Sequence, residues 1–204
     1  TINTQITNTG GNIQYIYASS ASVYGDASEK LWTEIDIPNC ASAYCRGKML
    51  NEEKVLASNG LVARITNVIG SGMSEGNVLS DILKQIPGKG PVLIRDEQPI
   101  RDFIWVEDLV DAFEKLLKSN QSGVFNIGSG KSLSIRQLAQ LTTKLSGDQR
   151  RTIKSIKQSD TESSSYVSIE KLKSTCAWKP KTSLTQSLEF LLLNRINKYP
   201  ENIK

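Results

Sequence analysis

The sequence predicts an α/β fold built on a parallel sheet, and two observations predict it. Short β-branched runs alternate along the chain with longer segments of helical periodicity, the order that gives strands connected by crossover helices. Turn-forming residues such as Ser58-Asn59-Gly60 and Pro87-Gly88 separate these segments. The chain has 204 residues, of which 38% are hydrophobic and 23% charged, so it is long enough and apolar enough to bury a core.

The first strand is expected at 12–20, where isoleucine and tyrosine alternate with smaller residues and the run ends in serines. A loop to Pro38 and a helix over 41–57 follow. Later strands are short apolar runs, expected at 61–65, 92–94, 103–106 and 124–127 and around Ile153. Later helices show apolar residues at helical spacing, at 78–86, 107–117 and 135–145 and on both sides of 178–181. The polar segments 70–76 and 158–165 are expected to be loops.

Composition excludes several classes of function. The net charge of +4 is mild, and the basic cluster between Lys144 and Lys157 lacks the aromatic residues of a nucleic-acid face, so we expect it to be solvated surface. The absence of histidine removes Ser-His-Asp chemistry and most zinc sites. The three cysteines have no metal-binding spacing and are expected to be free thiols. No apolar run is long enough to span a bilayer.

The chemistry of the chain concentrates in Tyr44 and Lys48, which share one face of the helix expected at 41–57. A phenol titrates near pH 10, so a tyrosine that acts as a general base near neutrality needs its pKa lowered by about 3. An ammonium about 4 Å away supplies much of that shift in a partly dry site. Alone, such a pair more often marks a solvated helix face. The hydroxyl of Ser20, at the end of the preceding strand, makes the pattern specific because it can hydrogen-bond the same substrate oxygen.

Further motifs surround this pair in a fixed order. They are Tyr15-Ile16-Tyr17-Ala18-Ser19-Ser20, Val23-Tyr24-Gly25, Asn67-Val68-x-Gly70, Arg101-Asp102-Phe103-Ile104, Asp108-Leu109 and Asn126-Ile127-Gly128-Ser129-Gly130. With Tyr44 and Lys48, this order resembles the extended short-chain dehydrogenase/reductases that act on nucleotide sugars, UDP-glucose 4-epimerase and its relatives. The resemblance covers nearly the whole chain.

The resemblance implies the C-terminal part of a Rossmann-type doubly wound parallel sheet plus a smaller α/β substrate-binding domain. Residues 1–66 would belong to the dinucleotide-binding domain and 67–204 mainly to the substrate-binding region, with 101–122 packing back on the Rossmann sheet. The family opens with a strand, a Gly-x-x-Gly-x-x-Gly turn and a helix, and this sequence has no such opening. We therefore expect a portion of a larger enzyme that is inactive by itself.

The resemblance also implies roles for individual residues. Ser20, Tyr44 and Lys48 would be catalytic. NAD, or alternatively NADP, would be bound by Tyr44 and Lys48 together with Ala18 and Ser19. The nucleotide-sugar substrate would contact Ser20, Ser22, Asn67, Arg101 and Lys157. No metal, nucleic acid or membrane partner is expected, and the full-length enzyme is expected to be a cytoplasmic homodimer.

Arg101 and Lys157 would bind the diphosphate with different geometry. Arg101 would fork onto it, although half of a surface ion pair is the alternative. Lys157-Gln158-Ser159-Asp160 stands where the family has an Arg-x-Gly-Asp-like turn. Lys157 keeps the charge of the expected arginine but loses its bidentate fork.

The segment Ala21-Ser22 favours one reaction type. Dehydratases of the family place Asp-Glu there, and UDP-glucuronate decarboxylases place a glutamate where Ser22 stands. Without a carboxylate, epimerisation through transient oxidation at C4 is best supported. A 4-keto-sugar reductase or a dehydratase of the same family is the alternative, and a non-catalytic dinucleotide sensor is the alternative of another class. For Ser22 itself, a turn residue without substrate contact is the alternative.

Two glycine-rich segments imitate phosphate-binding loops. Gly70 to Gly76 follows a strand, precedes a helix and has Asp96 twenty residues beyond it. We reject it as a dinucleotide loop because Glu75 would face the pyrophosphate and Pro87 cuts the helix short; the family instead places this loop beside the sugar-nucleotide pocket. The segment 126–130 is interpreted as a strand-to-helix turn rather than a phosphate cradle.

Overall fold

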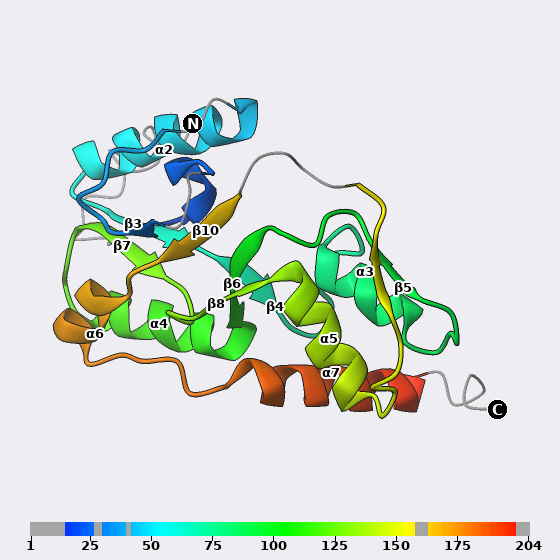
Figure 1. Ribbon diagram of the computed structural model, residues 1–204. Helices are drawn as coiled ribbons and strands as arrows, with labels where there is room; N and C mark the ends of the chain where they lie inside the picture. The colour runs from blue at the N-terminus through cyan, green and yellow to red at the C-terminus, as the bar shows by residue number, and fades with distance from the viewer. Residues whose placement is uncertain (1–14, 27–29, 40–41, 158–162, 199–204) are drawn as a thin grey trace.

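Three parallel strands form the first sheet of the computed structural model, which describes residues 15–26, 30–39, 42–157 and 163–198 (Figure 1). Their order is β1 (Ile16–Ser20), β3 (Leu61–Ile65) and β7 (Gly123–Ile127). The register pairs Ser20 with Ile65 and Ile65 with Ile127, so the carboxyl ends of the three strands meet at one edge. In parallel α/β sheets this edge is where ligands bind.

Helices cover both faces of this sheet. Helix α2 (Ala43–Ala57) lies on one face and α4 (Val106–Lys118) on the other, with the short helix α6 (Glu170–Cys176) beside it (Figure 1). The buried cluster between the sheet and α4 unites apolar side chains of both: Leu61, Ala63, Ile104, Leu109, Ala112, Leu116, Phe125, Ile127, Leu172 and Trp178. The helix that carries Tyr44 and Lys48 is therefore held on a sheet whose other face is packed.

The second sheet has the strand order β2 (Leu31–Trp32), β10 (Ser164–Val167), β6 (Ile100–Trp105) and β4 (Asn67–Ile69), and β8 (Ser132–Ser134) pairs antiparallel with β6. Successive side chains of β6 point to opposite faces. Ile104 consequently packs in the cluster of the first sheet, whereas Phe103 and Trp105 pack in a second buried cluster. Strand β6 thus connects the two cores.

The second core lies among α3 (Val78–Gln85), α5 (Ile135–Leu145), α7 (Leu184–Lys198) and the parallel pair β5 (Val92–Ile94) and β9 (Ile153–Ser155). Polar side chains fix where two of these helices begin. Asn77 accepts a hydrogen bond from the Ser80 amide at the start of α3, and Ser134 forms a capping box with Gln137 at the start of α5. These starts agree with the boundaries expected from the sequence.

The α/β fold with parallel strands is confirmed, but several short elements were missed. The expected loop to Pro38 contains a turn of 3₁₀ helix, η1 (Ala21–Tyr24), and strand β2. Strands β4 and β8 were not expected either. The loop expected at 158–165 is wrong for Ser164 and Ser165, which belong to β10, and 158–162 lie outside the described residues, as do 12–14.

The expectation of three free thiols is also wrong for one cysteine. Cys45 is disulfide-bonded, whereas Cys176 is a free thiol, and Cys40 lies outside the described residues. Across the described part of the chain, none of the helices combines the length and the apolar character needed to cross a bilayer.

Candidate functional site

Lys48 lies between two tyrosines at the junction of α2 and β1. Its ammonium donates a hydrogen bond of 2.7 Å to the Ala18 carbonyl, and it lies 5.1 Å from the ring centroid of Tyr17 and 5.7 Å from that of Tyr44. The two phenols differ in their surroundings. The Tyr17 hydroxyl accepts a hydrogen bond from Asn51 at 3.3 Å, whereas Tyr44 is 60% exposed and its hydroxyl bonds to none of the described residues. Tyr44 is therefore the phenol that is open to a ligand.

Ser20 and Ser22 form a pair of hydroxyls where β1 ends. Their oxygens are 2.9 Å apart, and Ser20 Oγ also accepts a hydrogen bond of 3.2 Å from the Ser22 amide. Cys45, the neighbour of Tyr44 in α2, has its sulfur 3.6 Å from Ser22 Oγ. Within the described residues, no carboxylate hydrogen-bonds either hydroxyl. The structure thus places both serines against the start of α2, with their hydroxyls bonded to each other and, among the described residues, to no carboxylate.

Ser19 points to the other side of β1 and is buried. Its hydroxyl donates a hydrogen bond to Glu52. Glu52 lies one turn beyond Lys48 on α2 and is bonded in turn by the Arg64 guanidinium, with a shortest distance of 2.7 Å. The Ser19 hydroxyl is therefore occupied inside the protein, so any cofactor contact at Ser19 and Ala18 falls to the backbone.

Tyr24 extends this buried network to β7. Its ring lies 4.7 Å from the Arg64 guanidinium carbon, and its hydroxyl donates a 2.8 Å hydrogen bond to Asn126. Burial raises the pKa of Tyr24 above its ordinary value, against the opposing effect of Arg64. Tyr24 is thus a neutral structural phenol. It fixes η1, the turn that follows Ser20.

Arg101 projects from β6 with most of its donors already used. Nη1 donates to the carbonyls of Ile100 (2.8 Å) and Ser163 (2.9 Å), and Nη2 donates to Ser163 Oγ (2.6 Å). Nη2 also forms an ion pair with Asp26 Oδ1 at 3.4 Å. The ion pair was foreseen only as an alternative, and neither Asp26 nor Ser163 was singled out from the sequence.

Asp102 is fully buried beside the turn that follows β7. Its carboxylate accepts hydrogen bonds from the amide and hydroxyl of Ser129 and from the amide of Gly130. Burial raises the pKa of Asp102 to about 6, and these hydrogen bonds oppose the shift. The amides of this glycine-rich turn are thus bound to a carboxylate of the protein, and the turn leads from β7 into the short strand β8 and not directly into a helix as expected.

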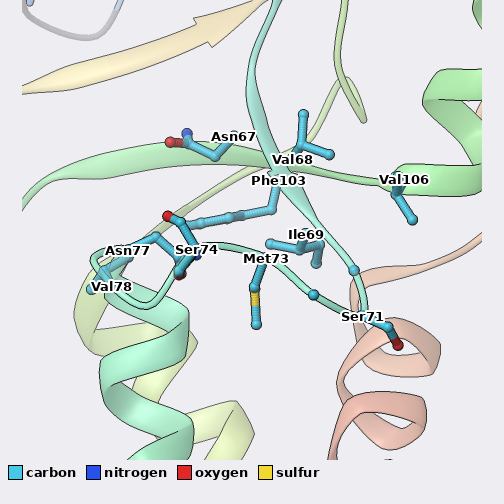
Figure 2. A pocket seen from close by; sticks show the side chains of 12 residues that line it. Asn67, Val68, Ile69, Ser71, Met73, Ser74, Asn77, Val78, Phe103 and Val106 are labelled. Atoms are coloured by element: carbon cyan, nitrogen blue, oxygen red, sulfur yellow. Dashed lines mark hydrogen bonds between the residues drawn. The ribbon is translucent and has the colours of Figure 1, made fainter.

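Asn67 begins β4 at the edge of a cavity of about 550 Å³ (Figure 2). Its amide nitrogen donates a 2.9 Å hydrogen bond to the Asp102 carbonyl. The cavity is lined by Asn67, Val68, Ile69, Gly70, Ser71, Gly72, Met73, Ser74, Asn77, Val78, Phe103 and Val106. Figure 2 shows Ser74 and Asn77 where the loop enters α3, and Phe103 between them and Asn67. The glycine-rich loop 70–76 thus borders a cavity of ligand size.

Lys157 is exposed, and its contacts with the described residues are made by its backbone. Its amide donates to the Arg95 carbonyl at 2.8 Å, and its carbonyl accepts from Ser155 Oγ at 2.7 Å. In the described part of the chain, its ammonium forms no ion pair and does not contact Arg101. Ser163 contacts Arg101 instead.

Among the functional residues that sequence reasoning missed, Glu52 alone left a signal, its four-residue spacing from Lys48. Asp26 and Ser163 left none, because they meet Arg101 only through the fold. Among the described residues, no group of three or more acidic, cysteine or histidine side chains is gathered to hold a metal ion.

Comparison with known proteins finds one family model and several relatives that match this chain. Residues 4–128 match the model of the NAD dependent epimerase/dehydratase family. GDP-6-deoxy-D-mannose reductase of Pseudomonas aeruginosa is 29% identical over 195 residues, which cover 87% of this chain and 64% of that protein. UDP-glucuronic acid decarboxylase 1 of Xenopus tropicalis is 29% identical over 187 residues, which cover 85% of this chain and 44% of that protein. The chain therefore spans less than two thirds of either relative.

Solved structures show the same relationship. The structure of RMD from Pseudomonas aeruginosa complexed with NADPH superposes with a TM-score of 0.86 at 25% identity, over 94% of this chain and 69% of that chain. UDP-glucose 4-epimerase of Thermotoga maritima with UDP-glucose superposes with a TM-score of 0.77 at 26% identity, over 92% of this chain and 64% of that chain.

Proposed function

Because the chain belongs to the NAD dependent epimerase/dehydratase family, we propose that it carries the catalytic and substrate-binding part of an enzyme that epimerises a nucleotide sugar at C4. Residues 1–66 belong in this proposal to the dinucleotide-binding domain and residues 67–204 mainly to the substrate-binding region. Helix α4, within 101–122, packs on the first sheet, and β7, which directly follows this range, is a strand of that sheet.

Tyr44 is the proton-transfer group in this proposal. It takes the proton from the C4 hydroxyl as C4 is oxidised and returns a proton when the ketone is reduced. Lys48 favours the phenolate electrostatically, and Ser20 donates a hydrogen bond to the reacting oxygen. The exposure of Tyr44, whose hydroxyl bonds to none of the described residues, and the nearby Lys48 ammonium support these roles. Ser22 orients the Ser20 hydroxyl through their 2.9 Å contact.

The same face of α2 fits a nicotinamide dinucleotide. A bound nicotinamide supplies the hydride acceptor and donor for C4. An ammonium has three donors, and Lys48 uses one of them on Ala18, so it keeps donors for the hydroxyls of a ribose. Tyr44 and Lys48 would hold this part of the cofactor, with backbone groups of Ala18 and Ser19.

The substrate lies in this proposal between the end of β1 and the cavity beside Asn67. The cavity volume of about 550 Å³ is within the range of small-molecule sites, roughly 300–1,000 Å³. Arg101 contributes the charge for the diphosphate, and Asn67 contributes an amide beside it. Lys157 contributes a weaker, longer-range charge because it is exposed and lacks a fork.

The observation that carries the reaction type is the site around Ser20 and Ser22, whose hydroxyls bond each other and, within the described residues, no carboxylate. Elimination of water or loss of carbon dioxide needs an acid or base that these positions do not supply. The test is mass analysis of products from UDP-, dTDP- and GDP-sugars. It uses the reconstituted enzyme, meaning this chain joined to a glycine-rich dinucleotide-binding segment. We expect a C4 epimer of unchanged mass, and a product lighter by one water or one carbon dioxide would contradict the proposal.

A 4-keto-sugar reductase is the second candidate, and the similarity to GDP-6-deoxy-D-mannose reductase favours it. The same three residues serve both reactions, so the balance of cofactor distinguishes them. An epimerase leaves the cofactor unchanged over a cycle, whereas a reductase consumes one reduced cofactor per keto-sugar. A non-catalytic dinucleotide sensor would show neither product.

A further inference from the structure

Asp26 and Arg101 form an ion pair between two parts of the candidate site. Asp26 directly follows Gly25, the residue that ends the η1 turn after Ser20. Arg101 lies in β6, two residues before Phe103 of the cavity wall. The contact of 3.4 Å therefore joins the loop from the catalytic strand end to the arginine on the substrate side.

The guanidinium of Arg101 has little capacity left for a ligand. A guanidinium carries five N–H donors. Both protons of Nη1 are taken by the Ile100 and Ser163 carbonyls, and one proton of Nη2 is taken by Ser163 Oγ. Counting the described residues alone, the donors that remain are Nε–H and the second Nη2–H, and Nη2 is the atom paired with Asp26. An anion that approaches Arg101 thus meets a carboxylate already at the guanidinium.

We propose that Asp26 is an internal competitor for the substrate diphosphate: its carboxylate holds the place on Arg101 that a phosphate group takes, and it must leave when a nucleoside diphosphate binds. This inference rests on the proposed function, because it takes Arg101 as a diphosphate contact. It adds that the chain contains a residue that lowers the affinity of its own substrate site.

Replacement of Asp26 by a phosphate requires that Arg101 stays fixed and that Asp26 can move into water. The Arg101 side chain is 22% exposed and is held by Ser163, so it keeps its orientation when its partner changes. The Asp26 side chain is 61% exposed, so water can solvate it once it is displaced. Two negative groups beside one guanidinium repel each other, which disfavours a state with both bound. Asp26 therefore weakens binding through competition and through repulsion.

The test is calorimetric titration of this chain with UDP and with GDP. Asp26→Asn removes the charge with little change of shape, and we expect it to bind both nucleotides about 2- to 5-fold more tightly, the range for loss of one exposed ion pair. The matched control is Glu114→Gln, because Glu114 is 59% exposed and pairs with Lys118 in the last part of α4, away from the residues that line the cavity. It should bind like the wild type. Uridine, which has no phosphate, should not distinguish Asp26→Asn from the wild type.

A double variant tests whether the effect acts through Arg101. The gain from Asp26→Asn should vanish in an Arg101→Ala background, and thermal melting shows whether each variant is folded. Four results would overturn the proposal: Asp26→Asn binding no tighter than wild type, an equal gain in Glu114→Gln, a gain that persists without Arg101, or no binding of either nucleotide by any variant. Tighter binding by Asp26→Asn, together with no C4 chemistry in the product assay, would refute the proposed function and leave this inference intact.

Discussion

Glu52 of α2 and Arg64 of β3 form a buried ion pair, with Oε2 and Nη2 2.7 Å apart and both side chains less than 10% exposed. Ser19 of β1 donates to the same carboxylate. One turn earlier in α2, Lys48 donates to the carbonyl of Ala18. Two consecutive turns of the helix are therefore bonded to two consecutive residues of β1. This arrangement fixes α2, which carries Tyr44, relative to the strand that ends at Ser20.

Glu52→Gln should destabilise the chain strongly. It leaves the Arg64 guanidinium buried without a counter-charge, and breaking a buried pair in this way costs about 3 kcal/mol or more. Urea unfolding measures the change. A second substitution, Arg64→Met, should recover part of the loss because it removes the uncompensated charge. The control is Glu114→Gln, whose exposed pair with Lys118 is worth about 1 kcal/mol or less. Equal midpoints for Glu52→Gln and wild type would show that the pair does not hold α2.

Gly128→Ala should also be destabilising, for steric reasons. A Cβ at this position would lie 2.5 Å from Asp102 Oδ2 and 2.9 Å from Thr66 Cγ2. The Asp102 carboxylate is held by the amides of Ser129 and Gly130, and the Thr66 amide donates to the Ile127 carbonyl between β3 and β4. Overpacking of this kind costs about 1–3 kcal/mol. Gly76→Ala is the matched control, since a Cβ there meets no atom within 4 Å and its φ is not positive. Both variants are compared by urea unfolding, and similar midpoints would contradict the expectation.

Because of Asp102, the free energy of unfolding should fall as the pH rises. Its pKa is about 6 in the folded chain against 3.8 as the ordinary value, so the folded state holds the proton more tightly. Its contribution to stability is therefore fully present below pH 3.8 and is lost as the pH rises through 6. Relative to Asp102→Asn, which does not titrate, the wild type should lose about 2 kcal/mol of unfolding free energy between pH 4 and pH 7. A constant difference between the two proteins across this range would contradict the assignment.

The longer elements followed from the sequence, and the physical reason is local. Helices such as α3, α4 and α5 bury an apolar stripe that repeats every three or four residues, and β3 and β7 are short, mainly apolar segments between turn signals. Strands β2, β4, β8 and β10 have two to four residues each and exist because a distant strand pairs with them. Their sequences carry no periodicity long enough to reveal them.

In the candidate site, too, local relationships could be predicted from the sequence and long-range contacts could not. Tyr44 and Lys48 are four residues apart on one helix, so their proximity was readable from spacing. The partners of Arg101 were not, because Ser163 is 62 residues away and reaches it only through the pairing of β10 with β6. The burial of Glu52 was equally hidden, since a charged residue in a helix is ordinarily exposed and its partner lies in a strand.

Arg101→Ala in the reconstituted enzyme should weaken substrate binding rather than the chemical step. A contact to the diphosphate is the same in ground and transition states, so its loss raises KM and leaves kcat nearly unchanged. Loss of about 2 kcal/mol of binding corresponds to an increase of KM by about 30-fold. Lys157→Ala should have a smaller effect, because its exposed ammonium makes no fixed contact. Steady-state kinetics measures both, and a fall in kcat with unchanged KM for Arg101→Ala would contradict its role.

Tyr44→Phe should act on the chemical step alone. It removes the hydroxyl that moves the proton, which typically lowers kcat by about 10²–10⁴-fold, while the nucleotide contacts and KM stay near the wild type. Tyr17→Phe is the matched control, because the Tyr17 ring also lies beside the Lys48 ammonium, at 5.1 Å against 5.7 Å for Tyr44. The Tyr17 hydroxyl is bonded to Asn51, so its removal should leave kcat near the wild type. Steady-state kinetics of the two variants in the reconstituted enzyme decides between the phenols. A loss of turnover in Tyr17→Phe, with Tyr44→Phe still active, would identify Tyr17 of β1 as the base and overturn the assignment of Tyr44.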